Sequence, residues 1–321
     1  MTRIVVAAYI GKPIERLVEE LRDSFPGVEF VPATTIEEEK SAIRNADAYI
    51  GVPAREVFLA ARKLKWVHVH ATGIESIAAI PELVESDVIV TNARGPHTTS
   101  MADHVFAMML TFAHRLRDLW EDQKAHRWDN KKYDESYLEL SGRTMGILAL
   151  GGIGMAVARR AHGFGMEVYA VDARPMAPPP EVKEVWGTER LDQLLRISDW
   201  FVVAAPKTPQ TWHLIDRRRI GLLKPTAHVI VLSRGGIIEE AALIEALKAR
   251  RIAGAGIDAF EREPLPPGSP LWDLDNVVIS PHASGVTPEM WEGRRQVLRQ
   301  NLARFLANEP FLYVCDKRAG F

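Results

Sequence analysis

The stretch Met145-Gly-Ile-Leu-Ala-Leu-Gly-Gly-Ile-Gly154 joins an apolar run to a glycine-rich turn, and a helical stretch follows through Ala161. A strand, a glycine turn and a helix together make an anion site. Glycine lets the backbone approach a ligand closely, and the helix N-terminus offers unpaired N–H groups. We therefore predict that this turn binds the pyrophosphate of a dinucleotide through Gly151, Gly152, Ile153 and Gly154.

An acidic residue after the next strand strengthens this prediction. Asp172 ends the apolar run Val168–Val171, 18 residues beyond Gly154, and an acid about 20 residues on typically accepts hydrogen bonds from the adenosine ribose. Ala149 stands where the motif usually has its first glycine, so a purely structural turn stays open as the other interpretation. Asp172 should repel a 2′-phosphate and favour NAD, whereas Arg174 could hold that phosphate and leaves NADP as the alternative.

Apolar runs and helical stretches alternate in two series around this motif. The first series has apolar runs at residues 4–8, 28–31, 48–51, 66–70 and 88–91. The second series has them at residues 145–150, 168–171, 201–205, 228–232, 253–257 and 277–280. Such alternation predicts parallel strands joined by helical crossovers, so we expect an α/β protein with two sheet domains of related plan. A helix is expected over residues 99–116. The charged and aromatic segment 120–140 is interpreted as an irregular arm that packs on another subunit.

Composition and charge narrow the classes of partner. The chain has 321 residues and a formal net charge of -2, which gives no reason to expect nucleic acid or an anionic membrane. The apolar stretch 105–113 is about half the ~20 residues that a membrane-spanning helix needs. The single cysteine, Cys315, cannot form an internal disulfide, which fits a reducing compartment. Because the sequence also shows no export signal, we expect a cytoplasmic protein.

Three reactive side chains follow three successive strands of the second series. They are Arg234, Glu263 and His282. Because ligands bind beyond the carboxyl ends of parallel strands, we expect these side chains to converge at the edge that carries the glycine turn.

Each of the three has a purely structural explanation when taken alone: a turn arginine in an ion pair, a solvated loop acid and a loop histidine. Together they suit a 2-keto acid, because arginine can grip a carboxylate with two bonds and polarise the neighbouring carbonyl. Histidine can supply a proton near neutral pH, and a glutamate beside it orients the ring and favours its protonated form.

The chain resembles the D-isomer-specific 2-hydroxyacid dehydrogenase family over nearly its whole length. Residues 253–272 match that family's long signature, and Ser280-Pro-His282 matches its histidine motif. Thr208-Pro-Gln-Thr211 matches the loop after its fourth strand, Thr72–Glu75 its substrate loop, and Ser100–His104 the start of its inter-domain helix.

The resemblance implies a role for each matching residue. Arg234 would bind the substrate carboxylate and carbonyl, and His282 would be the acid/base with Glu263 as partner. Main-chain N–H groups of Gly73 and Ile74 would meet the carboxylate. The cofactor residues would further include Pro206, Thr211 and Asp258.

The resemblance also implies an architecture. We expect two Rossmann-like or flavodoxin-like doubly wound parallel-sheet domains with a catalytic cleft between them. The substrate domain would comprise residues 1–95 plus 288–321, and the NAD(P)-binding domain residues 96–287. Relatives are usually dimers built around the cofactor domains, so a homodimer acting on a small 2-keto acid is expected.

Several alternatives remain open at this level. Glu75, Asp103, Lys207 and Val231 depart from the family's usual residues. An NAD(H)-sensing corepressor-like protein could share the fold and keep the same residues. A formate-type enzyme is disfavoured, because Glu263 stands where those enzymes place glutamine.

His68 and His70 lie on one side of a strand, but two histidines are too few for zinc, so no metal is expected. The sequence leaves the keto acid, the physiological direction and a phosphoglycerate dehydrogenase activity undecided.

Overall fold

A computed structural model describes residues 1–318 and divides the chain into two compact units. Unit 1 is Met1–His97 with the segment from Val286 onward, and unit 2 is Thr98–Gly285. Both divisions therefore fall two residues from the expected boundaries after residues 95 and 287. The expected domain also included residues 319–321, which lie outside the described residues.

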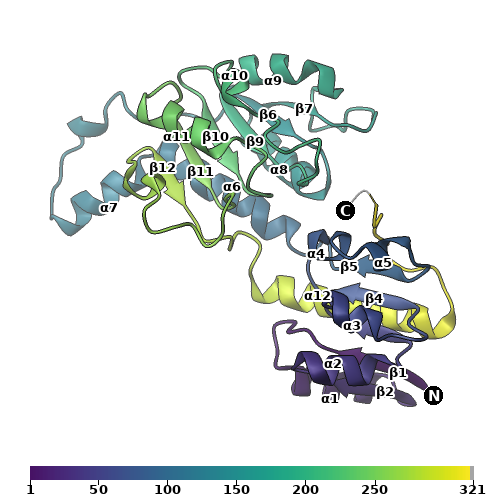
Figure 1. Ribbon diagram of the computed structural model, residues 1–321. Coiled ribbons are helices and arrows are strands. Elements are labelled where there is room, and N and C mark those ends of the chain that lie inside the picture. Colours follow the sequence, from purple (N-terminus) through teal and green to yellow (C-terminus); the bar gives the residue numbers. More distant parts are fainter. Residues whose placement is uncertain (319–321) are drawn as a thin grey trace. The chain divides into compact units, whose positions relative to one another are not determined.

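Unit 1 is built on a five-stranded parallel sheet with the strand order β2-β1-β3-β4-β5. The strands are β1 (Thr2–Val6), β2 (Val28–Pro32), β3 (Ala48–Ile50), β4 (Trp66–Val69) and β5 (Ile89–Asn92). The helices are α1 (Ile14–Ser24), α2 (Ile36–Ile43), α3 (Arg55–Leu59), α4 (Glu75–Ala78), α5 (Pro81–Glu85) and α12 (Pro288–Ala307). This order is that of the flavodoxin-like doubly wound fold. Figure 1 shows the unit in purple and blue, with the yellow helix α12 returning to it.

Helices cover both faces of this sheet. Ile4 and Val6 point into a core shared with α1 and with Leu298 of α12. Val5, between them, points into the opposite core with α2, α3, α4 and α5. Because successive side chains of a strand alternate between faces, a strand covered on both sides reads as one continuous apolar run.

Unit 2 is built on a seven-stranded parallel sheet with the order β12-β11-β10-β9-β6-β7-β8. The strands are β6 (Thr144–Leu148), β7 (Glu167–Val171), β8 (Glu184–Trp186), β9 (Trp200–Val203), β10 (His228–Val231), β11 (Gly254–Ile257) and β12 (Val277–Ile279). The helices are α6 (Thr98–Ala113), α7 (Leu116–Lys124), α8 (Gly152–Gly163), α9 (Leu191–Ile197), α10 (Arg217–Ile220) and α11 (Glu240–Lys248). Short 3-10 turns are η1 (Lys131–Tyr133), η2 (Thr188–Arg190) and η3 (Pro270–Asp273). The expectation of Rossmann-type parallel sheets is confirmed.

Strands β6 and β9 are parallel neighbours in unit 2, and the later strands are added outward from them on opposite sides of the sheet. The chain proceeds from β6 to β7 and β8 on one side, and from β9 to β12 on the other. Such a switch point leaves a crevice outside the carboxyl ends of the strands, where open α/β sheets bind their ligands. The expected glycine turn follows β6 at this position.

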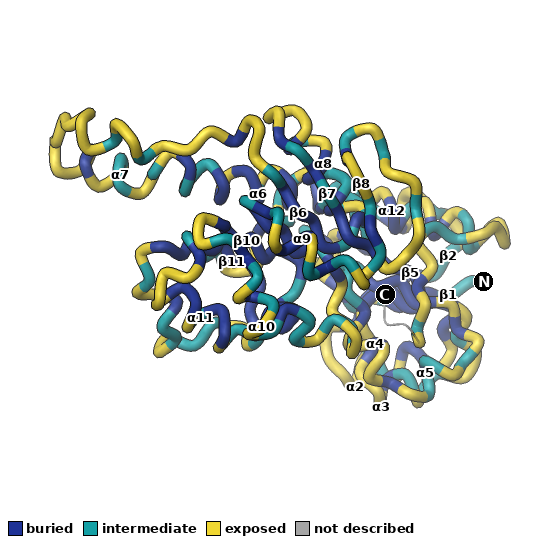
Figure 2. Tube along the Cα trace, turned by 90° about the horizontal axis from the view of Figure 1, so that it is seen from above, coloured by how far each residue is buried: buried dark blue, intermediate teal, exposed yellow. Residues whose placement is uncertain are grey.

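Two apolar cores sandwich the sheet of unit 2. Helices α6 and α8 contribute to one core, and α9, α10 and α11 to the other. Figure 2 shows the strands of this unit as a largely dark-blue, buried centre. Across residues 1–318 no helix has both the length and the apolar character needed to cross a membrane.

The segment after α6 differs from expectation. Helix α6 stops at Ala113, Arg115 takes a left-handed backbone conformation (φ 47°), and α7 then begins at Leu116. The predicted irregular structure is therefore wrong for residues 120–124, which are helical. The helix was missed because α7 buries only Asp122 and so shows no apolar stripe. Figures 1 and 2 show α7 and the chain after it projecting from unit 2, mostly exposed.

Candidate active site

The glycine turn after β6 forms the expected strand–turn–helix unit. Ala149 donates its N–H to Val171 O (2.8 Å) and takes a left-handed conformation, with φ 72°. Gly151 caps helix α8. A Cβ atom on Gly154 would lie 2.2 Å from Ala149 O, so no larger residue fits there without displacing the turn. An added Cβ on Gly151 would meet nothing within 4 Å among the described residues, so the backbone is open to a ligand there.

These features fit a dinucleotide pyrophosphate. The first N–H groups of α8 lack intrahelical acceptors, and the 12-residue helix directs its positive dipole end toward the turn. Gly152 is exposed and Ile153 half-buried, so the N-terminal turn of α8 is accessible.

Asp172 lies just after β7 and holds the turn in shape. Its carboxylate accepts the N–H of Leu150 (2.8 Å) and the N–H of Arg174 (2.8 Å), and the Nε of Arg174 lies 3.4 Å away. The Asp172 side chain is buried, whereas that of Arg174 is largely exposed. One acidic group therefore connects the end of β7 to the glycine turn.

The histidine expected to act as acid/base is paired with the expected glutamate. His282 Nδ1 donates to Glu263 Oε2 at 2.8 Å, and Glu263 Oε1 accepts the N–H of Phe260 at 3.0 Å. Both side chains are partly exposed. Because Nδ1 carries the proton that bonds the carboxylate, Nε2 is the ring atom left to give or take a proton.

Arg234 follows β10, and its loop is tied to the loop that carries Glu263. Its Nη1 donates to Ser233 O at 2.8 Å. A Cβ on Gly235 would lie 1.8 Å from Phe260 O, so the two backbones approach as only glycine allows. Gly236 takes a positive φ of 82° and packs beneath Trp212. The three predicted catalytic residues thus all follow strands at one edge of the sheet of unit 2.

Asp258 is fully buried at the end of β11 and anchors the histidine loop. Its Oδ1 accepts Ser280 Oγ–H (2.5 Å) and Ala283 N–H (2.9 Å), and its Oδ2 accepts Ser284 N–H (3.1 Å). The chain between these bonds carries His282 in a left-handed conformation, with φ 52°.

Helix α6 supports the same loop through two residues that sequence reasoning did not place there. His104 Nε2 donates to Ser280 Oγ at 2.8 Å, since the serine proton is already directed at Asp258. Ser100 Oγ donates to Ser284 O at 2.7 Å. Both residues belong to Ser100–His104, which resembles the start of the family's inter-domain helix. Their contacts with Ser280 and Ser284 became visible only in the folded chain.

The remaining predicted cofactor residues lie on the loop after β9. Thr211 Oγ1 donates to Pro206 O at 2.8 Å and accepts the N–H of Thr208 at 2.7 Å, which closes the loop on itself. Pro206 is exposed.

Gly73 and Ile74 lie in unit 1, directly after β4. Asn92 Nδ2 donates to Thr72 O at 2.7 Å and so fixes the start of their loop, and Ile74 is buried just before α4. Within the described part of the chain, no group of three or more His, Cys, Asp or Glu side chains could hold a metal ion.

Comparison with known proteins extends these observations. Residues 106–284 match the family described as D-isomer specific 2-hydroxyacid dehydrogenase, NAD binding domain. A glyoxylate reductase of Korarchaeum cryptofilum is 36% identical over 258 residues, covering 79% of this chain and 76% of its own.

Two further similarities span nearly the whole chain. A D-3-phosphoglycerate dehydrogenase of Methanocaldococcus jannaschii is 34% identical over 97% of this chain, which spans 60% of that relative's length. The crystal structure of an NADPH-dependent glyoxylate/hydroxypyruvate reductase of Sinorhizobium meliloti, with NADP and sulfate, superposes with a TM-score of 0.85. It shares 27% identity and covers 100% of both chains.

The conformation of Ala149 leads to a stability prediction. A non-glycine residue with positive φ costs on the order of 1 kcal/mol, because its Cβ crowds the backbone. We expect Ala149→Gly to raise the free energy of unfolding of unit 2 by about 0.5–1 kcal/mol, as measured by denaturant unfolding.

Ala156→Gly provides the matched control, because Ala156 lies within helix α8. There the same exchange should lower the free energy of unfolding by about 1 kcal/mol. Destabilisation by both exchanges would contradict the strain inferred at Ala149.

Proposed function

Because the chain belongs to the D-isomer specific 2-hydroxyacid dehydrogenase family, we propose that it reduces small 2-oxo acids to D-2-hydroxy acids with a nicotinamide dinucleotide. The observation that carries the proposal is the His282–Glu263 pair (2.8 Å) at the same sheet edge as Arg234, in the unit that carries the NAD-binding match. The comparisons support the reaction class, and the following roles are our assignment.

His282 is assigned as the acid in reduction and the base in oxidation. Its Nδ1 is held by Glu263, so Nε2 protonates the oxygen of the 2-oxo group as that oxygen gains charge. Glu263 favours the protonated ring by placing a negative charge beside it and fixes its orientation. Asp258 keeps the backbone around His282 in its left-handed conformation.

Arg234 is assigned to the substrate carboxylate and the adjacent carbonyl. A guanidinium can form two parallel hydrogen bonds with a carboxylate and polarise the neighbouring oxygen. The main-chain N–H groups of Gly73 and Ile74 are proposed as further donors to the same carboxylate.

The cofactor is assigned to the β6–α8 turn, Asp172 and the loop from Pro206 to Thr211. When bound, the nicotinamide supplies the hydride in reduction. Gly151, Gly152, Ile153 and Gly154 would hold the pyrophosphate, and Asp172 with Arg174 the adenosine ribose. Asp258 would also help to hold the nicotinamide amide.

Removal of either proposed catalytic group tests the reaction. We expect His282→Ala and Arg234→Ala each to lower kcat with 2-oxo acids by about 10²–10⁴-fold, because general acid catalysis and charge stabilisation contribute effects of this size. Binding of NADH, measured by fluorescence titration, should change little.

His213→Ala is the matched control, because His213 Nε2 forms a similar pair with Glu261 (2.9 Å). This variant should retain most of its turnover. Wild-type turnover in His282→Ala would disprove the assignment. A wild-type chain that binds NADH but reduces no 2-oxo acid would favour a dinucleotide-sensing protein.

Glu263→Gln tests the role of the histidine's partner through pH dependence. The glutamine keeps an acceptor for His282 but removes the negative charge that favours the protonated ring. Reduction should therefore decline at a lower pH than in the wild type, which narrows the active range on its alkaline side. An unchanged pH profile of kcat would contradict the pairing.

Asp172 and Arg174 generate a prediction about cofactor choice. We expect a higher kcat/KM with NADH than with NADPH, because the buried Asp172 carboxylate repels a 2′-phosphate. Arg174→Met should lower kcat/KM for NADPH more than for NADH, since Arg174 is the cation beside that carboxylate. Arg159→Met, an exposed arginine on α8 that is paired with Glu181, should leave the ratio unchanged. A wild-type preference for NADPH would contradict the NAD assignment.

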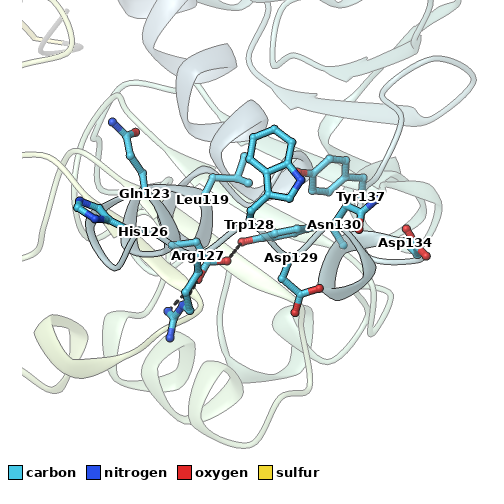
Figure 3. Close-up of a pocket in the computed structure, with 11 residues that line it drawn as sticks. Leu119, Gln123, His126, Arg127, Trp128, Asp129, Asn130, Asp134 and Tyr137 are labelled. Atoms are coloured by element: carbon cyan, nitrogen blue, oxygen red, sulfur yellow. Dashed lines mark hydrogen bonds and ion pairs between the residues drawn. The ribbon is translucent and has the colours of Figure 1, made fainter.

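We further propose a homodimer formed through the arm, residues 120–140 of unit 2. Trp128 is 98% exposed and Trp120 61% exposed, and the arm lines an open hollow of about 770 Å³ (Figure 3). Asp122 stiffens the arm by accepting bonds from Lys132 and Tyr133, the Lys132 bond being the main cause that lowers the pKa of Asp122 to about 2. An ordered arm with exposed aromatic side chains suits a contact with a second copy.

The mass of the protein in solution tests this surface. Light scattering at micromolar concentration should give twice the chain mass. Trp128→Ser should raise the dimer dissociation constant by about tenfold or more, because buried tryptophans dominate interfaces. Trp272→Ser, at a tryptophan 50% exposed elsewhere in unit 2, should leave it unchanged. A monomer at all concentrations would disprove the proposal.

A further inference from the structure

In unit 1, four basic side chains have a buried nitrogen atom without a hydrogen-bond partner among the described residues. One is Arg3 of β1, whose Nη1 forms an ion pair with Glu29 at 3.4 Å. The other three have no carboxylate partner among the described residues. They are His68 and His70, at the end of β4, and Arg294 of α12, which together we call the basic cluster. His68 Nε2, His70 Nδ1 and Arg294 Nε are all buried, and none has a hydrogen-bond partner within the part of the chain that the structure describes. Buried polar atoms are nearly always paired, so three such atoms in one region need an explanation.

The hydrogen bonds around His68 show what its free nitrogen offers. Trp66 Nε1 donates to Thr91 Oγ1 at 2.9 Å, and the same hydroxyl lies 2.9 Å from His68 Nδ1. Because the indole must donate, the hydroxyl proton is available for His68 Nδ1, which leaves the ring proton on Nε2. Fully buried His68 thus presents an N–H donor that lacks an acceptor.

Arg294 adds a positive charge that no carboxylate of the described residues neutralises. Its guanidinium carbon lies 5.2 Å from the ring centroid of Trp291, and burial lowers its pKa. Its neighbour Arg295 is paired with Glu292, so α12 does provide carboxylates where a structural ion pair is formed. Arg294 is half-buried and its Nε is buried. A partly desolvated cation without an anion is costly, so an acidic ligand would stabilise it.

The two histidines are held close to this charge. Burial, and next the positive charge of Arg294, lower the pKa of His70. Burial lowers the pKa of His68 to about 3. Both rings are therefore neutral near pH 7, and each can donate one hydrogen bond beside the arginine.

The cluster lies next to the loop assigned to the substrate, within the same unit. His70 lies two residues before that loop, Thr72–Glu75. On α12, a Cβ on Gly293 would lie 2.7 Å from Pro96, and the following residue, His97, lies 3.2 Å from Thr72 through its Nδ1. These contacts place the beginning of α12 against the chain that positions Thr72 and Gly73.

We propose that the basic cluster binds a second acidic group, a carboxylate or a phosphate, at the distal end of the 2-oxo acid. Arg294 forms the ion pair, while His68 and His70 donate hydrogen bonds to the same group. The preferred substrates are then 2-oxo acids with two anionic groups rather than glyoxylate or pyruvate. This inference rests on the proposed function.

The first experiment compares matched substrates with the full chain. The pairs are oxaloacetate with 2-oxobutyrate, 2-oxoglutarate with 2-oxopentanoate, and 3-phosphohydroxypyruvate with hydroxypyruvate. We expect kcat/KM to be at least about tenfold higher for the dianionic member of one pair, since charge-assisted hydrogen bonds to a half-buried arginine have effects of this size. The pair showing the preference identifies the group as a carboxylate or a phosphate.

The second experiment removes the charge. Arg294→Met keeps an unbranched side chain on Trp291 and should abolish the preference within that pair. Arg299→Met, an arginine on the same helix that is paired with Glu292, should preserve it. A melting temperature of Arg294→Met equal to or above that of the wild type would show that the variant folds, because the exchange removes an unpaired, half-buried charge.

A binding measurement separates this inference from the proposed function. Succinate and inorganic phosphate are the unreactive probes, and at least one should raise the melting temperature of the wild type but not of Arg294→Met. Turnover of 2-oxo acids without any preference, or a preference that survives in Arg294→Met, would overturn the basic-cluster assignment alone. If no 2-oxo acid is reduced, the proposed function fails, and the presence or absence of the Arg294-dependent shift still decides the anion site.

Discussion

The burial of one carboxylate, that of Asp258, organises the candidate active site. It lies at the end of β11 with no exposed surface and accepts three hydrogen bonds from Ser280, Ala283 and Ser284. Each hydrogen bond to a charged group contributes about 1.5–3 kcal/mol, so together they offset the cost of burying the charge. His282 lies in the chain between Ser280 and Ala283, so its position depends on Asp258, which follows the neighbouring strand β11.

The parallel sheet of unit 2 explains why such short loops can assemble a site. Strands β10, β11 and β12 are adjacent and in register, so the residues that follow them meet at one edge without long connections. Gly235 then allows the loop of Arg234 to touch the backbone at Phe260, whose N–H is held by Glu263. The reactive side chains are thus positioned by rigid strands and by main-chain hydrogen bonds.

The basic cluster of unit 1 differs from Asp258 in how its polar atoms are bonded. Asp258 accepts three hydrogen bonds, whereas one buried nitrogen atom each of His68, His70 and Arg294 has no partner among the described residues. A carboxylate with all these bonds formed suits a structural role, and a binding role is our proposal for the unpaired nitrogen atoms of the basic cluster.

Local patterns in the sequence predicted every strand except β8, the glycine turn, the acid at Asp172 and the candidate residues Arg234, Glu263 and His282, because periodicity and residue type are local properties. Helix α7 and strand β8 were missed, since α7 buries only one acidic residue and β8 is three residues long at the sheet edge. Only the tertiary structure decided that Glu263 bonds His282, that His104 and Ser100 support the histidine loop, and that Ala149 adopts a positive φ. The same holds for the basic cluster, which joins β4 to a helix more than two hundred residues later. The physical reason is that burial and hydrogen-bond satisfaction depend on atoms brought together by the fold, and spacing along the chain does not record them.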